Sequence, residues 1–253
     1  TIRNDIKITY LAGQIGLDPS TMQLVSSKGG WGSELIQCVS NCKAVLNAVY
    51  EKDETFRVMR WVAYVSWKEC GMMGDSVPCS EISTSVRLMC RGLFTESDLP
   101  VSIVPVPKLP RDAAIELELI ASQRSRSETL SYTKDHVRLE ASFVRRRCVV
   151  ASVSFSCDDE EEEDVSLNFQ EIIDKVIFEK CQLDDASTLC INILAFVVLS
   201  CDSSSCNELE YEIERSFRDR KIGQIKLSVL PVRTLSTKSE FLHVLMECFH
   251  SVP

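Results

Sequence analysis

The chain carries the sequence VPVPKLPRDAAIELE at residues 104–118. Two apolar runs, residues 102–106 and 114–121, lie on either side of a connection that contains Pro107 and Pro110. Short apolar runs bounded by such turn residues are typical of β-strands. The stretch therefore predicts two strands joined through residues 107–112.

Further helices and strands are predicted on the N-terminal side of this stretch. Residues 31–52 have apolar side chains spaced three and four apart, which is the pattern of a helix with one buried face. The side chains predicted to be buried are Leu35, Cys38, Cys42, Val45 and Val49. Residues 57–67 read as a strand, and residues 79–93 repeat the helical spacing. Strand-like residues 6–16 and 22–25 flank a turn at residues 18–20.

The same order of elements recurs in the second half of the chain. The predicted strands are residues 137–143, 148–155, 189–199, 225–232 and 241–249, and the predicted helices are residues 169–177 and 209–217. Corresponding elements are separated by about 120–135 residues, which is the size of a single domain. We therefore predict an α+β fold of two tandem β-β-α-β-α-β-β domains, residues 1–125 and 126–253, which meet in the polar segment 122–127.

The chain is acidic, with 28 Lys and Arg residues against 37 Asp and Glu residues and a net charge of −9. This balance argues against a partner nucleic acid, because such binding depends on positive charge. The seven acids of residues 158–164 repel one another, so we expect a solvated loop there. No apolar run reaches the ~18–20 residues that a membrane-spanning helix needs, so no membrane partner is expected.

Cysteine is abundant, with 12 residues, but its spacing predicts neither a disulfide framework nor a metal site. The cysteines lie in apolar stretches without a CxxC pair, so we expect reduced, buried thiols and a cytoplasmic protein. Zinc binding or a redox role is the weaker alternative.

The three histidines, His136, His243 and His250, all lie in the second half and suggest no His pair for phosphoester cleavage.

Three segments resemble the Rid (YjgF, reactive-intermediate deaminase) family. Residues 10–19, YLAGQIGLDP, resemble its SGQIPxDP hairpin, and residues 37–46, QCVSNCKAVL, resemble its helix pattern Q-x-x-x-N-x-K-A-x-L. Residues 104–118 resemble its signature V-x-V-x-x-L-P-x-D-x-x-I-E-I-E. The resemblance covers residues 6–121, and residues 131–253 keep only the order of elements. It implies chorismate-mutase-like domains, each with a mostly antiparallel sheet backed by two helices.

The resemblance implies half of a substrate-binding site in the first domain. Glu116 matches the family's carboxylate that helps to position the hydrolytic water, and Gly13 matches a glycine that lines the pocket. Glu116 is therefore the candidate catalytic residue, and Gly13 and Glu116 are the candidate substrate-binding residues. The alternative for Glu116 is a strand carboxylate that faces solvent or an interface arginine. The family's N-terminal G-P-Y-S-Q segment has no match in this chain.

The rest of the family's site is missing. The arginine that holds the substrate carboxylate falls on Val101, and on Leu227 in the second repeat. The second-repeat counterpart of Glu116 falls around residues 241–243, which contain no carboxylate. The candidates for a replacement cation in the first repeat are Arg87, Arg91 and Arg111.

Two Rid-like repeats in tandem resemble the C-terminal region of the eukaryotic diphthine–ammonia ligases. That family amidates diphthine on elongation factor 2 with ATP and ammonium, and its S-G-G-K-D-S phosphate loop has no match here. We therefore expect no cofactor in this chain, ATP belonging to the absent ligase module, and the start at Thr1 predicts a fragment or a processed chain. The chain is expected to be mainly an assembly and binding region, not catalytic alone. The alternatives are an imine or enamine deaminase that releases ammonia and, by family name only, an endoribonuclease.

The expected partners are other copies of this chain and, through the parent enzyme, elongation factor 2. Large apolar side chains on the sheet of the first repeat, with Trp61, Tyr64 and Trp67 as candidates, predict contact between sheets. Because Rid units form a barrel from three sheets, two repeats in one chain predict a homo-oligomer. The number of chains is not predicted.

Overall fold

The computed structural model describes residues 7–25, 30–50, 56–66, 68–70, 82, 84–89, 100–123, 128–134, 137–144, 148–156, 189–198, 211, 215, 224–232 and 240–250. The chain divides into two compact units, Thr1–Ser127 and Glu128–Pro253. The division falls at the end of the polar segment 122–127. Both units contain antiparallel-rich sheets, and the predicted α+β class is confirmed.

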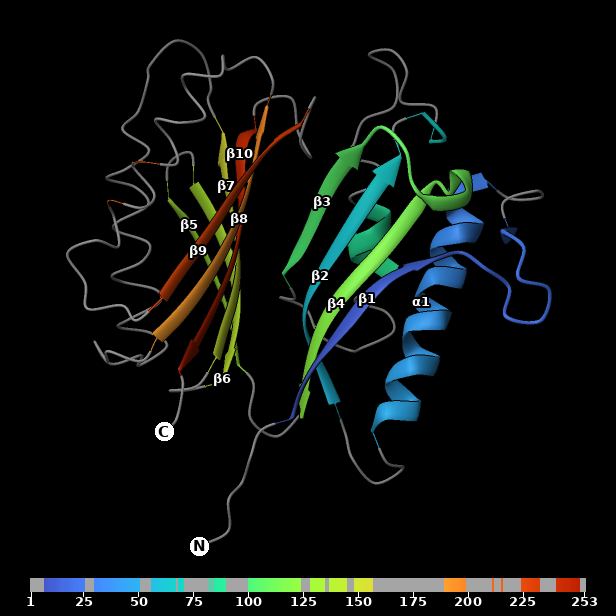
Figure 1. Ribbon diagram of the computed structural model, residues 1–253, viewed down its shortest axis with the longest axis horizontal. Coiled ribbons are helices and arrows are strands. Elements are labelled where there is room, and N and C mark those ends of the chain that lie inside the picture. The colour runs from blue at the N-terminus through green and yellow to red at the C-terminus, as the bar shows by residue number, and fades with distance from the viewer. Residues whose placement is uncertain are drawn as a thin grey trace, which may run out of the picture. The chain divides into compact units, whose positions relative to one another are not determined.

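The first unit is built on a four-stranded sheet in the order β1-β4-β2-β3 (Figure 1). Its strands are β1 (Ile8–Ile15), β2 (Phe56–Ser66), β3 (Val101–Val106) and β4 (Ile115–Gln123). β4 pairs antiparallel with both β1 and β2, and β2 pairs parallel with β3. The strands expected from the 104–118 stretch are therefore β3 and β4, and their connection contains a 3-10 turn at Pro110–Asp112.

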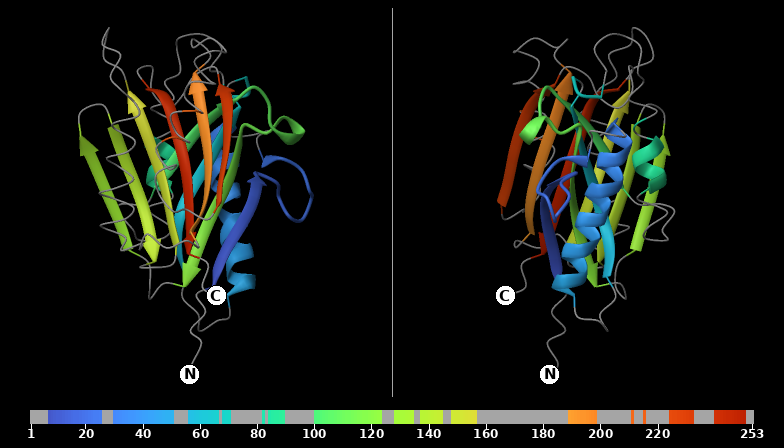
Figure 2. Two further views of the ribbon diagram at one scale, coloured as in Figure 1. Left: turned by 60° about the vertical axis from the view of Figure 1, so that its left-hand side comes forward. Right: turned by 90° about the vertical axis from the view of Figure 1, so that its right-hand side faces the viewer.

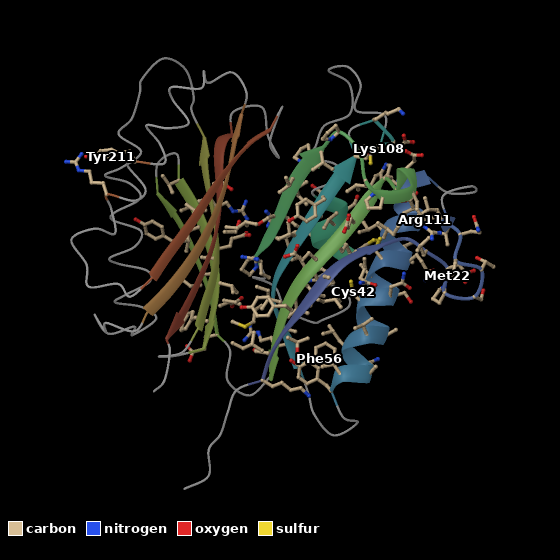
Figure 3. The ribbon with its side chains drawn as sticks, viewed as in Figure 1. Met22, Cys42, Phe56, Lys108, Arg111 and Tyr211 are labelled. Atoms are coloured by element: carbon tan, nitrogen blue, oxygen red, sulfur yellow. The ribbon has the colours of Figure 1, made fainter. Side chains whose placement is uncertain are left out.

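The helix α1 (Gly30–Val49) packs on one face of this sheet, and residues 82 and 84–89 are also helical. Both helical segments lie on the same side of the sheet, as the right-hand view of Figure 2 shows. The core between helices and sheet includes Leu35, Cys38, Cys42, Trp61, Ile82, Val86, Ile103, Ile115 and Leu117. Figure 3 shows Cys42 between α1 and the strands. The apolar spacing in the sequence therefore identified the layer that covers the sheet.

The structure corrects the predicted buried face of α1. Leu35, Cys38 and Cys42 are fully buried, but Val45 and Val49 are each 37% exposed. Val39 and Leu46 take their places in the core. At about 100° per residue, Leu46 lies about 20° from Leu35 around the helix axis, whereas Val45 lies about 80° from it. Val45 and Val49 lie in the last five residues of α1, where Leu46 is the residue that belongs to the core.

One short strand predicted in the first unit does not form. Residues 22–25 were expected to make a strand, but only an isolated bridge joins Leu17 and Leu24. Met22 has a φ of 57°, which is incompatible with an extended strand. The segment after β1 is instead a tight turn, with Met22 N–H donating to Asp18 O at 2.8 Å.

The second unit contains a six-stranded sheet in the order β5-β6-β7-β10-β8-β9. The strands are β5 (Glu128–Lys134), β6 (Val137–Val144), β7 (Cys148–Ser156), β8 (Leu189–Val198), β9 (Gln224–Val232) and β10 (Glu240–His250). β5 was not predicted, because ETLSYTK is polar at most positions and gives a weak apolar signal. The helix predicted at residues 169–177 lies outside the described residues, and of residues 209–217 only Tyr211 and Arg215 are described, both helical.

The second sheet repeats the strand order of the first. Strands β7-β10-β8-β9 have the same succession of antiparallel, antiparallel and parallel pairs as β1-β4-β2-β3. The second sheet continues beyond β7 with β6 and β5. In the part of the chain that the structure describes, no helix is long and apolar enough to cross a membrane.

Candidate functional site

Strand β4 separates the core from the candidate site. Ile115, Leu117 and Leu119 alternate along the strand and enter the core beneath α1. Glu116 and Glu118 are both partly exposed and occupy the intervening positions. Successive side chains of a strand point to opposite faces of the sheet, so the two carboxylates share the face away from α1. We call this the Glu116 face.

The structure brings the two predicted site residues, Gly13 and Glu116, into contact. The pairing of β1 with β4 shifts register between Leu11 and Gln14, and Ile15 pairs with Glu116. A Cβ atom built on Gly13 would lie 1.7 Å from Oε1 of Glu116 and 2.8 Å from its Cγ. Only glycine leaves room for the carboxyl group at this place, so the glycine of the YLAGQIGLDP segment has a defined steric role.

Strand β2 adds two further polar side chains to the Glu116 face. Tyr64 is paired with Glu116 across the strands, and its hydroxyl donates a long hydrogen bond of 3.5 Å to Oε2 of Glu118. Arg60, four positions before Tyr64 on the same strand, is only 3% exposed. Its positive charge acts on the Tyr64 hydroxyl. The face therefore combines two carboxylates, a phenol and a guanidinium.

The electrostatics of this face disfavour additional negative charge. Partial burial, followed by the charge of Glu118, raises the pKa of Glu116 above its ordinary value of 4.5. Burial, followed by the charge of Glu118, raises the pKa of Tyr64 to about 12, although Arg60 acts in the opposite direction. Tyr64 is therefore a hydrogen-bond donor at neutral pH, and Glu116 takes up a proton more readily than an exposed glutamate.

Val101 lies on the opposite side of the sheet from Glu116. It pairs with Trp61 at the start of β3, is 1% exposed and belongs to the core beneath the helices. A guanidinium at this position would enter an apolar core. The structure therefore offers no carboxylate-binding group from residue 101 to the Glu116 face.

Two of the three arginines considered as replacements bind elsewhere. Arg87 donates from Nη2 to the carbonyl oxygen of Val101 at 2.9 Å. Arg111 donates from Nη1 to the carbonyl oxygen of Met22 at 2.8 Å, and Figure 3 shows these two labelled residues close together. Arg91 lies outside the described residues. Sequence reasoning missed Arg60, whose signal is its alternation in β2 with the core residues Trp61, Ala63 and Val65.

Alternation in β2 also changes the expected surface for sheet contact. Trp61 is fully buried in the core beneath the helices and does not accompany Tyr64 on the Glu116 face. Trp67 lies outside the described residues. Tyr64 is therefore the one candidate of the three that the structure places on that face.

Among the residues of the second unit that the structure describes, the positions expected for a comparable site lie in its strands. Leu227 lies in β9, where it pairs with Ile193 of β8, and His243 lies in β10, where it pairs with Ser154. Glu140 of β6 is 7% exposed and forms an ion pair with Arg138. Among the residues that the structure describes, no group of three or more His, Cys, Asp or Glu side chains could hold a metal ion.

Comparisons with known proteins give similarities of structure only. No protein-family model and no curated protein matches the chain. One similar structure is the YjgF gene product of E. coli, at 20% identity and a TM-score of 0.34, covering 49% of this chain and 85% of that one. A second is YyfA of Yersinia pestis, a protein of unknown function of the Rid family, at 27% identity and a TM-score of 0.34, covering 45% and 79%. A third is E. coli TdcF with bound serine, at 18% identity and 0.34, covering 46% and 80%.

The structures found include Rid/YjgF family proteins, and each of these three matches covers less than half of this chain.

Proposed function

We propose that this chain is the Rid-like tandem region of a diphthine–ammonia ligase of the eukaryotic type, and that it acts in assembly and binding. Three observations support the Rid-like part of this proposal. The segment that resembles the family hairpin supplies Gly13, the helix segment supplies Asn41, and the C-terminal signature supplies Glu116. In the fold these residues lie in β1, α1 and β4, which contact one another.

The observation that carries the non-catalytic assignment is the burial of Val101. A deaminase that acts on a 2-imino acid has to hold a carboxylate, and hydrogen bonds to charged groups are worth about 1.5–3 kcal/mol each. Val101 is 1% exposed on the core side of the sheet and cannot supply them. Without that interaction, Glu116 has no oriented substrate on which to act.

The Glu116 face then serves as a contact surface. It presents an acceptor in each carboxylate and a donor in the Tyr64 hydroxyl, together with the apolar surface of the tyrosine ring. Such a mixture suits a protein partner, because tyrosine contributes area and a hydrogen bond at small entropic cost. We propose a second copy of this chain as the first partner, with elongation factor 2 reached through the parent enzyme.

The ligase assignment is tested on elongation factor 2 itself. In cells that lack the gene for this chain, mass spectrometry of elongation factor 2 should show diphthine in place of diphthamide. Re-expression of the full gene should restore diphthamide, and so should the Glu116→Gln variant, because the carboxylate has no catalytic part in the proposal. Diphthamide that persists without the gene would contradict the assignment, and failure of Glu116→Gln alone would contradict the non-catalytic role.

A second candidate function is an imine or enamine deaminase, and Arg60 is the observation that favours it. This guanidinium lies on the strand that carries Tyr64, close enough for its charge to act on the Tyr64 hydroxyl. It is a cation that could hold a substrate carboxylate from a different strand. Titration with 2-oxobutyrate, a stable carboxylate analogue, should shift the nuclear magnetic resonance signals of Glu116 in the wild type and not in Arg60→Leu if this function is correct.

A further inference from the structure

Glu34 of α1 is a buried carboxylate whose hydrogen bond reaches the start of β4. It is 1% exposed. Its Oε2 accepts the backbone N–H of Ala114 at 2.7 Å, and Ala114 is two residues before Glu116. A buried carboxylate is costly unless hydrogen bonds compensate it. Its presence on the inner side of α1 therefore needs a specific explanation.

The carbonyl oxygens of Ala114 and Ile115 also accept hydrogen bonds. Cys38, one helical turn after Glu34, directs its Sγ to the carbonyl oxygen of Ile115 at 3.6 Å. The carbonyl oxygen of Ala114 accepts the N–H of Ser66 at 2.9 Å. The two peptide groups that lead into Glu116 are therefore held by α1 on one side and by the end of β2 on the other.

The end of β1 is held by the same helix. A Cβ atom on Gly16 would lie 2.7 Å from Cα of Glu34, so the backbones of β1 and α1 approach closely at this point. Two turns after Glu34, Asn41 donates from Nδ2 to the carbonyl oxygens of Ile15 at 3.2 Å and Leu17 at 3.0 Å. One helix thus fixes the segment after Gly13 and the segment before Glu116.

We infer that Glu34 is a positioning residue, which places Glu116 against Gly13 by holding the Ala114 peptide at the entry to β4. Ala114 is 3% exposed, so its N–H would have no acceptor if the Glu34 carboxylate were removed. An unsatisfied buried N–H is costly, and the segment would move to find another acceptor. Because Glu116 follows directly, its carboxyl group would leave the surface of Gly13. This role does not depend on which ligand the Glu116 face binds.

The test compares three variants of the full chain by nuclear magnetic resonance. Glu34→Gln keeps an oxygen acceptor, Glu34→Met keeps the length but removes the acceptor, and Leu46→Ala damages the packing of α1 away from Ala114. The readouts are the cross-peak between Gly13 Hα and the Glu116 side chain and the pKa of Glu116 from its carboxyl carbon. We expect both to be retained in Glu34→Gln and Leu46→Ala. In Glu34→Met the cross-peak should be lost and the pKa should fall towards 4.5.

The inference is overturned if folded Glu34→Met keeps the cross-peak and the raised pKa of Glu116. It is equally overturned if Leu46→Ala changes both readouts as much as Glu34→Met does, because the role would then be general packing. Should Glu34→Met fail to fold, Glu34→Asp replaces it, since one methylene fewer withdraws the carboxylate from Ala114. A full cross-peak in Glu34→Asp, with the hydrogen bond to Ala114 lost, would also overturn the inference.

Discussion

Gly13 of β1 and Glu116 of β4 are in direct contact. The structure gives its missing Cβ a physical meaning, because the Glu116 carboxyl group occupies the space that a side chain would take. No positive φ is involved, since Gly30 is the glycine with a positive φ among the described residues. The requirement for glycine at position 13 is therefore steric, and it depends on Glu116.

We predict that Gly13→Ala lowers the free energy of unfolding by less than about 1 kcal/mol, because Gly13 is exposed and the new methyl group displaces only the flexible side chain of the partly exposed Glu116. The same substitution in a Glu116→Ala background should cost much less. Urea unfolding of the four proteins of this cycle measures the coupling, which we expect at about 0.5 kcal/mol. Equal costs of Gly13→Ala in both backgrounds would show that Glu116 does not lie on Gly13.

The raised pKa of Glu116 predicts a pH dependence of stability. An acid whose pKa is raised in the folded state favours folding when protonated, and this contribution is lost as pH rises from 4.5 through the folded pKa. Glutamine does not titrate, so the Glu116→Gln variant does not lose this stability as pH rises. Its stability relative to wild type should therefore increase as pH rises through that window. Urea unfolding at a series of pH values measures the difference, and a difference that stays flat or decreases would contradict the shift.

At the scale of elements, helical spacing predicted α1 but not the centre of its buried face. Two apolar stripes were available in the sequence, one through Val39 and Leu46 and one through Val45 and Val49. The sheet contacts the first, because β1 and β4 lie beneath Leu35, Val39 and Leu46. Periodicity fixes which residues share a stripe, but only the packed sheet decides which stripe is central.

A matched pair of helix variants tests this placement. Leu46→Ala should lower the free energy of unfolding by about 2–5 kcal/mol, because the side chain is fully buried. Val45→Ala, one position away, should cost less than about 1 kcal/mol, because this side chain is 37% exposed. Urea denaturation measures both. A larger cost for Val45→Ala than for Leu46→Ala would restore the face expected from the sequence.

Strand β2 shows why the candidate site was only half predicted. Glu116 and Gly13 were accessible through resemblance to a family pattern, whereas Arg60 and Tyr64 belong to no such pattern. Their position on the Glu116 face follows from the pairing of Tyr64 with Glu116 and from the register shift between Val58 and Arg60. Alternation within β2 indicates that Arg60 and Tyr64 share a face, but register between strands distant in sequence is set by tertiary packing, so the sequence of β2 did not show that this face carries Glu116.

At the scale of the whole molecule, the order of elements in the sequence predicted most strands of both sheets. The two sheets also share the same succession of antiparallel, antiparallel and parallel strand pairs. The residue patterns did not predict this pairing. β5 was not predicted because its sequence, ETLSYTK, is polar at most positions. Pairing with β6 stabilises β5, although the sequence of β5 alone does not predict a strand.

The proposed assembly role predicts more than one chain per particle. Light scattering of the 28.5 kDa chain at micromolar concentration should give a mass at least twice that of one chain. Tyr64→Glu should reduce this mass, because it places a third acid beside Glu116 and Glu118 on the proposed contact face. A wild-type mass that stays at 28.5 kDa when the concentration is raised tenfold would contradict the prediction.

Ammonia release from 2-iminobutyrate, generated in situ, tests the central claim most directly, because this substrate carries the carboxylate that Val101 cannot hold. The wild-type chain should release ammonia no faster than the reaction without protein, and Glu116→Ala should give the same rate. Accelerated release by the wild type that disappears in Glu116→Ala would contradict the non-catalytic assignment and establish a deaminase.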